Sequence, residues 1–192
     1  MGRTLKSPKP CTHSIGTVVP ASLATRSRSR QYCALGSFDS EPVVGVVHAP
    51  LLARTYAARK GGGAFRDERR IHVSDRTSER AIVATGFPFR RKDVLTEYEP
   101  VFGAALHTFE DLRRVGAASL DLCWTAEGVF DGYFELRLGP WDVAAGAIIV
   151  REAGGIVTDW GGDPSAWLGS GDILAGPPGV HAELARIAST QA

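Results

Sequence analysis

The chain has 192 residues, 44% of them hydrophobic, which is enough for one substantial core and too few for two full domains. Its formal net charge of +1 provides no overall field that would attract nucleic acid or an anionic membrane. No apolar run approaches the roughly 20 residues of a membrane span, and the three cysteines have no disulfide or zinc spacing, so we expect a soluble, cytoplasmic protein.

The first residues, 1–38, differ in composition from the rest of the chain. They contain no Asp or Glu, but they carry scattered Lys and Arg, including Arg26, Arg28 and Arg30. Such a start is typical of an organelle transit peptide, a disordered basic arm or a stretch translated out of frame. The arginines have no interleaved aromatics, so they do not favour nucleic acid as a partner. We therefore separate this basic, acid-free segment from a second region, 39–192.

The first expected strands follow in chain order. Val43–Val47 is a β-branched run between two prolines, which is typical of a buried strand. Residues 54–58 predict a second strand, Gly61–Gly63 a turn, and residues 71–73 the returning strand of a hairpin. Residues 81–85 form another apolar run, and the Gly-Phe-Pro after it indicates a strand that enters a loop.

Helices are expected where apolar residues recur at intervals of three and four. This spacing predicts helices over residues 94–107 and 116–129, and the apolar run 143–153 predicts a largely buried helix that ends at Gly154-Gly155. Further strands are expected at 133–136, 156–159 and 173–175, and a closing helix at 180–188. The elements alternate without a regular βαβ period, which predicts an α+β or layered α/β fold.

Asp142 is the first candidate for chemistry. It stands just before the predicted helix 143–153, where exposed backbone N–H groups and the helix dipole favour a carboxylate. The simplest interpretation is an N-cap. A functional interpretation is also open, because Ala144, Ala145 and Gly146 are small and would let a hard cation or a phosphate approach the helix start.

A longer run around Asp142 carries a family resemblance. Its parts are Gly116-Ala117-Ala118, Phe130-Asp131-Gly132-Tyr133-Phe134-Glu135, Trp141-Asp142-Val143-Ala144-Ala145-Gly146 and Glu152-Ala153-Gly154-Gly155. This run closely resembles the C-terminal signature of the inositol monophosphatase family, within the larger group of Mg²⁺-dependent, lithium-sensitive phosphatases. The resemblance extends over roughly residues 39–188. It implies a layered αβαβα sandwich of the sugar-phosphatase type, here without its N-terminal helical layer, and a homodimer.

The resemblance also implies roles for three residues. Asp142 matches an aspartate that binds Mg²⁺, Glu135 matches a carboxylate that accepts hydrogen bonds from substrate hydroxyls, and Ala118 matches a small residue that contacts the substrate. Structural alternatives remain for each, since Glu135 fits the solvent-facing position of an alternating strand and Ala118 fits helix packing. Glu152 fits a helix-end carboxylate bonded to the glycine turn, and we assign it no catalytic role.

The upstream half of the family's metal site has no counterpart. In the family, an Asp-Pro-Ile/Leu-Asp-Gly-Thr motif and an earlier Glu-Glu pair supply most of the metal ligands, whereas Ser14-Ile15-Gly16-Thr17 is the nearest remnant here. A hard cation usually requires about six oxygen ligands, so we expect this chain to bind Mg²⁺ poorly. The composition of 1–38 favours a truncated or frame-shifted product over a specialised arm.

Two classes of function therefore stay open. The first is a Mg²⁺-dependent phosphomonoesterase that hydrolyses inositol monophosphate or a related small phosphorylated polyol or sugar, with its activity lost where the upstream ligands are missing. Relatives in the same group act on fructose 1,6-bisphosphate, histidinol phosphate or a nucleotide 3′-phosphate. The second is a non-catalytic fragment that acts as a binding or dimerisation module.

Overall fold

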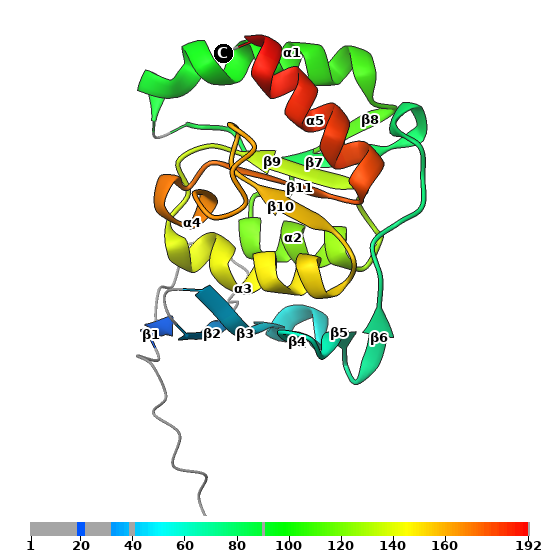
Figure 1. The fold of residues 1–192 in the computed structure, drawn as a ribbon, viewed down its shortest axis with the longest axis vertical. Helices are drawn as coiled ribbons and strands as arrows, with labels where there is room; N and C mark the ends of the chain where they lie inside the picture. Colours follow the sequence, from blue (N-terminus) through cyan, green and yellow to red (C-terminus); the bar gives the residue numbers. More distant parts are fainter. Residues whose placement is uncertain (1–18, 22–31, 39–40, 90, 192) are drawn as a thin grey trace, which may run out of the picture.

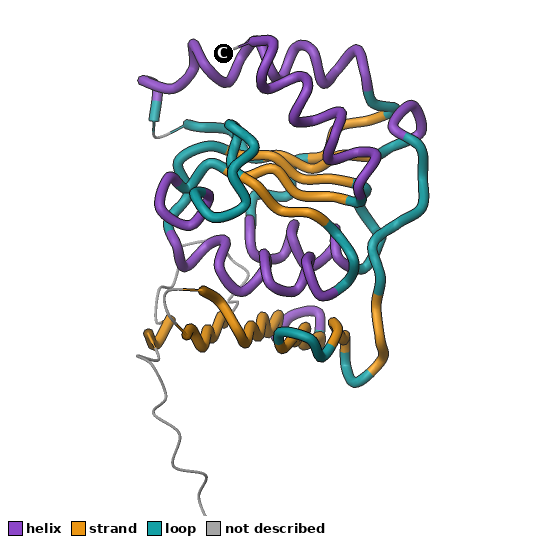
Figure 2. The backbone as a smooth tube through the Cα atoms, in the orientation of Figure 1, coloured by secondary structure: helices purple, strands orange, loops and turns teal. Residues whose placement is uncertain are grey.

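The computed structural model describes residues 19–21, 32–38, 41–89 and 91–191. Within them, secondary structure is stacked in four layers, seen edge-on in Figure 1 and by element type in Figure 2. A first sheet lies at the bottom of the view, two helices cover it, a second sheet follows, and two further helices close the top. The layered α+β arrangement expected from the sequence is confirmed.

The first sheet is an antiparallel meander. Its six strands lie side by side in sequence order, β1 to β6. Val47 lies opposite Tyr56 in this sheet, and both side chains are fully buried against the helices above. The strands are β1 (Val19–Ala21), β2 (Tyr32–Phe38), β3 (Glu41–Ala49), β4 (Arg54–Arg59), β5 (Gly63–Arg66) and β6 (Arg69–Ile71).

The second sheet is mixed and has the order β10-β11-β9-β7-β8. Strand β7 runs parallel to both β8 and β9, so Ala84 lies beside Arg113 on one side and beside Tyr133 on the other. Strands β11 and β10 continue the sheet with antiparallel pairing. The strands are β7 (Ile82–Thr85), β8 (Asp111–Arg113), β9 (Gly132–Glu135), β10 (Ile156–Thr158) and β11 (Ile173–Gly176).

Two helical layers enclose the second sheet. The inner layer is α2 (Ala118–Ala126) and α3 (Pro140–Glu152), and the outer layer is α1 (Leu95–Thr108) and α5 (Pro178–Gln191). A one-turn helix, α4 (Trp167–Ser170), lies beside α3, and three short 3-10 turns occur at Pro50–Leu52, Ser78–Arg80 and Lys92–Val94. Among the described residues, no α-helix covers the outer face of the first sheet.

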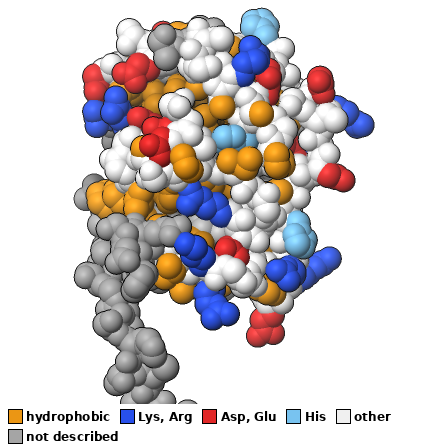
Figure 3. Space-filling model, viewed as in Figure 1, with side chains coloured by type: hydrophobic (Ala, Val, Ile, Leu, Met, Phe, Trp, Pro, Cys, Tyr) orange, Lys and Arg blue, Asp and Glu red, His pale blue; other side chains and the backbone are white. Residues whose placement is uncertain are grey.

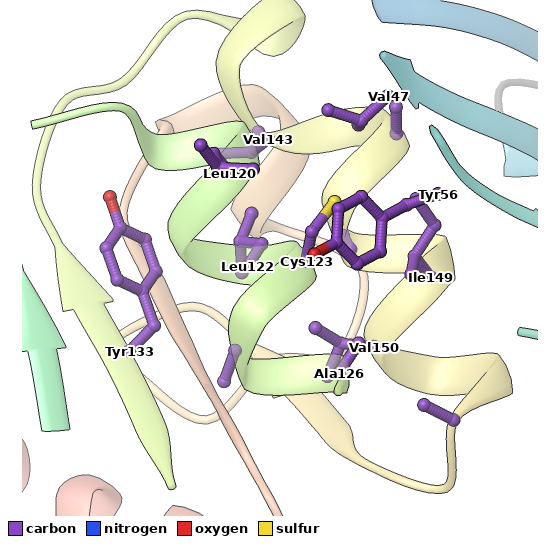
Figure 4. Packing of buried hydrophobic residues seen from close by; sticks show 14 of the residues in the cluster. Val47, Tyr56, Leu120, Leu122, Cys123, Ala126, Tyr133, Val143, Ile149 and Val150 are labelled. Carbon is purple, nitrogen blue, oxygen red and sulfur yellow. The ribbon is translucent and has the colours of Figure 1, made fainter. Parts of the chain in front are cut away.

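Each helical layer has its own hydrophobic core. The inner core joins the first sheet, α2, α3 and the inner face of the second sheet, and its central side chains are labelled in Figure 4. The outer core joins α1 and α5 to the opposite face of the second sheet. Successive residues of β9 serve different cores, because Tyr133 belongs to the inner one and Phe134 to the outer one.

The sequence located most elements but not all. The predicted helices over 94–107, 116–129, 143–153 and 180–188 are confirmed as α1, α2, α3 and α5, with ends shifted by a few residues. The helix stop at Gly154 is also confirmed, since this residue has a φ of 91° after the C-cap. Strands β5 and β8 and helix α4 were not predicted. The returning hairpin strand was expected at 71–73, whereas the chain returns earlier as β5, and β6 ends at Ile71. Strands β1 and β2 lie within the acid-free segment 1–38. The other residues of this segment, which include Ser14–Thr17 and Arg26–Arg30, lie outside the described residues.

Helix α3 packs unusually closely against its two neighbours. A Cβ atom added to Gly45 of β3 would lie 2.5 Å from Cγ2 of Ile148 and 2.7 Å from the carbonyl oxygen of Ala145. A Cβ atom added to Gly146 of α3 would lie 2.6 Å from Cβ of Leu122 in α2. Glycine at these positions therefore sets the separation between α3, the first sheet and α2.

The surface agrees with the near-neutral composition. Figure 3 shows basic and acidic side chains scattered over the visible face, with apolar side chains between them. In the described part of the chain, no helix is long and apolar enough to cross a membrane.

We expect Gly45→Ala to lower the free energy of unfolding by about 1–3 kcal/mol, because its methyl group meets the α3 backbone and a branched side chain that cannot both move aside. Gly103→Ala in α1 is the matched control. Its added Cβ has open space, so the variant should be neutral or gain up to about 1 kcal/mol from helix propensity. Urea unfolding of both variants measures the difference, and equal stabilities would contradict the close packing at Gly45.

Candidate functional site

The site lies where three parallel strands end. Strands β7, β8 and β9 run in the same direction, so the residues that follow them emerge at one edge of the second sheet. Gly86 follows β7, Arg114 follows β8, and Glu135 is the last residue of β9. Helix α2 begins shortly after β8, and helix α3 begins shortly after β9. The sheet thus brings two helix starts and several charged side chains to the same edge.

Asp142 lies in the first turn of α3 rather than before the helix. Pro140 occupies the first helical position, where its fixed φ and missing N–H are favourable, so the cap position falls on Gly139. The prediction that Asp142 is the N-cap was therefore wrong. Its Oδ2 accepts a hydrogen bond from the Gly139 N–H at 3.0 Å, and burial raises its pKa, with this hydrogen bond acting in the opposite direction.

Tyr133 stands at the centre of the site. Its ring is fully buried, and its hydroxyl points toward the ends of α2 and α3 that carry Leu120 and Val143 (Figure 4). The hydroxyl donates a hydrogen bond to Oε2 of Glu135. Burial raises the pKa of Tyr133 well above its ordinary value, and the charges of Glu135, Asp121 and Asp142 raise it further. Three carboxylates from α2, β9 and α3 therefore act on one phenol.

Glu135 is not a solvent-facing strand residue. It shares the inner face of β9 with Tyr133 and is only partly exposed, which contradicts the structural alternative for this position. A Cβ atom at Gly86 would lie 2.0 Å from the Glu135 carboxyl carbon, so a larger residue there would displace this carboxylate. Burial raises the pKa of Glu135 to about 7, and the negative charge of Asp142 contributes to this increase. The hydrogen bond from Tyr133 and the positive charge of Arg114 act in the opposite direction.

Asp121 is a third carboxylate, which the sequence analysis missed. It is fully buried in α2, where its Oδ2 accepts a long hydrogen bond of 3.3 Å from the Ala117 N–H and its Oδ1 has no partner among the described residues. Burial raises its pKa to about 7, and the charge of Glu135 adds to the increase. The sequence did contain an indication of this site: Asp121 stands between Leu120 and Leu122 in an apolar helix, where a charged residue is unexpected.

Ala118 and Glu152 have different places. Ala118 is the first residue of α2, is 9% exposed, and lies one turn before Asp121, so the structure brings it to the edge that carries the carboxylates. Its contact with a substrate stays a prediction. Glu152 lies at the other end of α3, where its two oxygens accept hydrogen bonds of 2.8 Å from the N–H groups of Gly61 and Gly63. It fastens α3 to the glycine turn between β4 and β5.

The carboxylates do not form a complete metal site. Asp142, Glu135 and Asp121 offer the oxygen ligands that Mg²⁺ prefers. Among the residues that the structure describes, however, no three Asp, Glu, His or Cys side chains are placed to hold one metal ion. The role of Asp142 as a Mg²⁺ ligand therefore stays a prediction.

We expect Asp121→Asn to become more stable relative to the unchanged protein as pH rises. Asp121 has a pKa of about 7 when folded and roughly 4 when unfolded, so its contribution to stability is present below about pH 4 and is lost as pH rises to 7. Asn has no such dependence. The difference in unfolding free energy should grow by roughly 2–4 kcal/mol between pH 4 and pH 8.

Chemical unfolding at several pH values measures this difference. Asp75→Asn removes an exposed aspartate and serves as the control, for which the difference should stay nearly constant. A difference that does not change with pH for Asp121→Asn would contradict the raised pKa.

Comparisons with protein families and with known proteins indicate the same family. A profile of the inositol monophosphatase family matches residues 34–192. The Nus factor SuhB of Haemophilus influenzae is 43% identical over 142 residues, which cover 73% of this chain and 53% of that protein. The fructose-1,6-bisphosphatase/inositol-1-monophosphatase of Aquifex aeolicus is 40% identical over 149 residues, which cover 77% of this chain and 55% of that protein.

Solved structures agree with the sequence relatives. The crystal structure of the extragenic suppressor protein suhB from Bartonella henselae superposes with a TM-score of 0.78 at 33% identity, over 82% of this chain and 60% of that one. The chain spans about half the length of the curated relatives it matches. The match over most of its residues shows that the chain belongs to the inositol monophosphatase family.

Proposed function

We propose that this chain carries the C-terminal half of the active site of a Mg²⁺-dependent phosphomonoesterase. Its substrate is inositol monophosphate or a related small phosphorylated polyol or sugar. The observation that carries the proposal is the meeting of Asp142, Glu135 and the start of α2 around the Tyr133 hydroxyl, in a member of the inositol monophosphatase family.

Each residue has a specific part in this proposal. Asp142 is one oxygen ligand for Mg²⁺, and the hydrogen bond from the Gly139 N–H to its Oδ2 orients the carboxylate. Glu135 accepts hydrogen bonds from substrate hydroxyls, and the Tyr133 hydroxyl fixes its orientation. Ala118 leaves room for the substrate at the start of α2. The remaining Mg²⁺ ligands must come from outside the described residues or from another chain.

Several finer assignments accompany the proposal. The printed name of the Aquifex aeolicus relative supports fructose 1,6-bisphosphate as an alternative substrate, and histidinol phosphate remains a second alternative. We further propose a homodimer in the cytoplasm.

A second candidate is a non-catalytic binding or dimerisation module. The observation that favours it is the incomplete set of metal ligands in the described residues, together with relatives that carry the name Nus factor. Such a module would use the same fold for a partner protein and would need no Mg²⁺.

The phosphatase proposal predicts that the half-site works once the other half is supplied. We expect a hybrid, in which residues 34–192 follow the preceding part of the Aquifex aeolicus relative, to release phosphate from inositol monophosphate with Mg²⁺. Asp142→Asn in the hybrid should lower kcat/KM by at least roughly 100-fold, because a metal ligand is lost. Glu135→Gln should mainly raise KM, by roughly ten-fold, because a charged hydrogen-bond acceptor is lost.

Glu99→Gln, which removes an exposed glutamate of α1, is the control for both variants and should leave the rate unchanged. Circular dichroism confirms that each hybrid is folded. A folded hybrid that releases no phosphate from inositol monophosphate, fructose 1,6-bisphosphate or histidinol phosphate would contradict the proposal.

The chain by itself distinguishes the two candidates through Mg²⁺ binding. We expect calorimetric titration to give weak binding, with a Kd of roughly 1 mM or more, because one or two carboxylates cannot replace several water ligands of Mg²⁺. Asp142→Asn should remove the remaining signal. Tight binding that depends on Asp142 would contradict the binding-module candidate, whereas weak binding unchanged in Asp142→Asn would contradict the metal-ligand role.

A further inference from the structure

Arg114 is a charged residue at the site to which neither the family match nor the proposed chemistry gives a role. It follows β8 and precedes α2, at the edge where β7, β8 and β9 end. Its guanidinium carbon lies 5.8 Å from the ring centroid of Phe87 and 5.3 Å from that of Phe89. The two rings stand edge to face at 5.6 Å, so the guanidinium is held by a paired aromatic surface.

The guanidinium nitrogens of Arg114 have no acceptor in the described part of the chain. No carboxylate there lies within ion-pair distance, and no hydrogen bond from this side chain is formed. The neighbouring Arg113 differs, because it forms an ion pair with Asp111 and donates to the Leu112 carbonyl oxygen. Arg114 therefore keeps its planar set of N–H donors available while its position is fixed by the two rings.

The location of Arg114 relates it directly to Glu135. Phe87 follows Gly86, whose Cα packs against the Glu135 carboxylate. Because the Arg114 guanidinium contacts the Phe87 ring, it lies at the same end of the sheet as the Glu135 carboxylate, and its positive charge lowers the pKa of Glu135. A substrate whose hydroxyl binds Glu135 would therefore have the Arg114 guanidinium beside it.

We propose that Arg114, supported by Phe87 and Phe89, is a subsite for a second phosphate group, so that the preferred substrates are small sugar or polyol bisphosphates. This inference rests on the proposed function, since Glu135 must face the substrate. A guanidinium matches phosphate with two parallel hydrogen bonds, and its aromatic support reduces the conformational freedom lost on binding. A monophosphate would leave these donors hydrated and gain nothing from them.

Calorimetric titration of the intact chain with fructose 1,6-bisphosphate and with fructose 1-phosphate, both in Mg²⁺, tests the subsite. We expect the bisphosphate to bind at least roughly ten-fold more tightly, as a charge-assisted phosphate contact implies. Arg114→Gln should reduce this ratio to about one. Arg113→Gln removes the same charge from the adjacent residue and should leave the ratio unchanged, and thermal unfolding confirms that both variants are folded.

Three results would overturn the subsite: equal affinities for the two sugars in the unchanged chain, no measurable binding of either sugar, or equal losses of preference in the two arginine variants. Failure of the phosphatase proposal gives a different pattern. In that case the hybrid releases no phosphate, while the preference for the bisphosphate and its dependence on Arg114 persist.

Discussion

The close contact of α3 with the first sheet at Gly45 and with α2 at Gly146 is the constraint on which the rest of the structure depends. Because glycine contributes no side chain to either contact, α3 lies close to both neighbours, and its residues from Val143 to Val150 are all buried. Glu152 fixes the far end of the helix to the turn between β4 and β5. The position of the first turn, and hence of Asp142, therefore follows from packing that lies outside the site.

The same packing gathers the acidic side chains at a cost in free energy. Asp121, Glu135 and Asp142 come from three different elements, and burial raises the pKa of each of them. The Tyr133 hydroxyl satisfies only one of these carboxylates, and Oδ1 of Asp121 has no partner in the described residues. A group of this kind is stable only with protons or a cation nearby, which is the condition expected at a functional site.

The sequence predicted those features that depend on local pattern. The apolar run 143–153, the stop at Gly154 and the β-branched run around Val46 each specify one element, and each was found. The sequence predicted the site less completely. Asp121 belongs to no motif, and β8 has only three residues, two of them charged, so it has no apolar pattern that would indicate a strand. The cap prediction for Asp142 failed because it ignored the preference of proline for the first helical position. The bond between Glu152 and Gly61 joins residues far apart in the chain, so no local pattern contains it.

The charge state of the site separates the two candidate functions more clearly than the fold does. With pKa values of about 7, Asp121 and Glu135 are only partly ionised at neutral pH when no cation is present. A bound Mg²⁺ would favour the ionised forms and release protons on binding. In a module that binds another protein through a different surface, no cation would bind, and the same carboxyls would stay only partly ionised at neutral pH. Only the phosphatase candidate therefore predicts proton release on Mg²⁺ binding. The contacts of α3 cannot distinguish the two candidates, because both have the same fold.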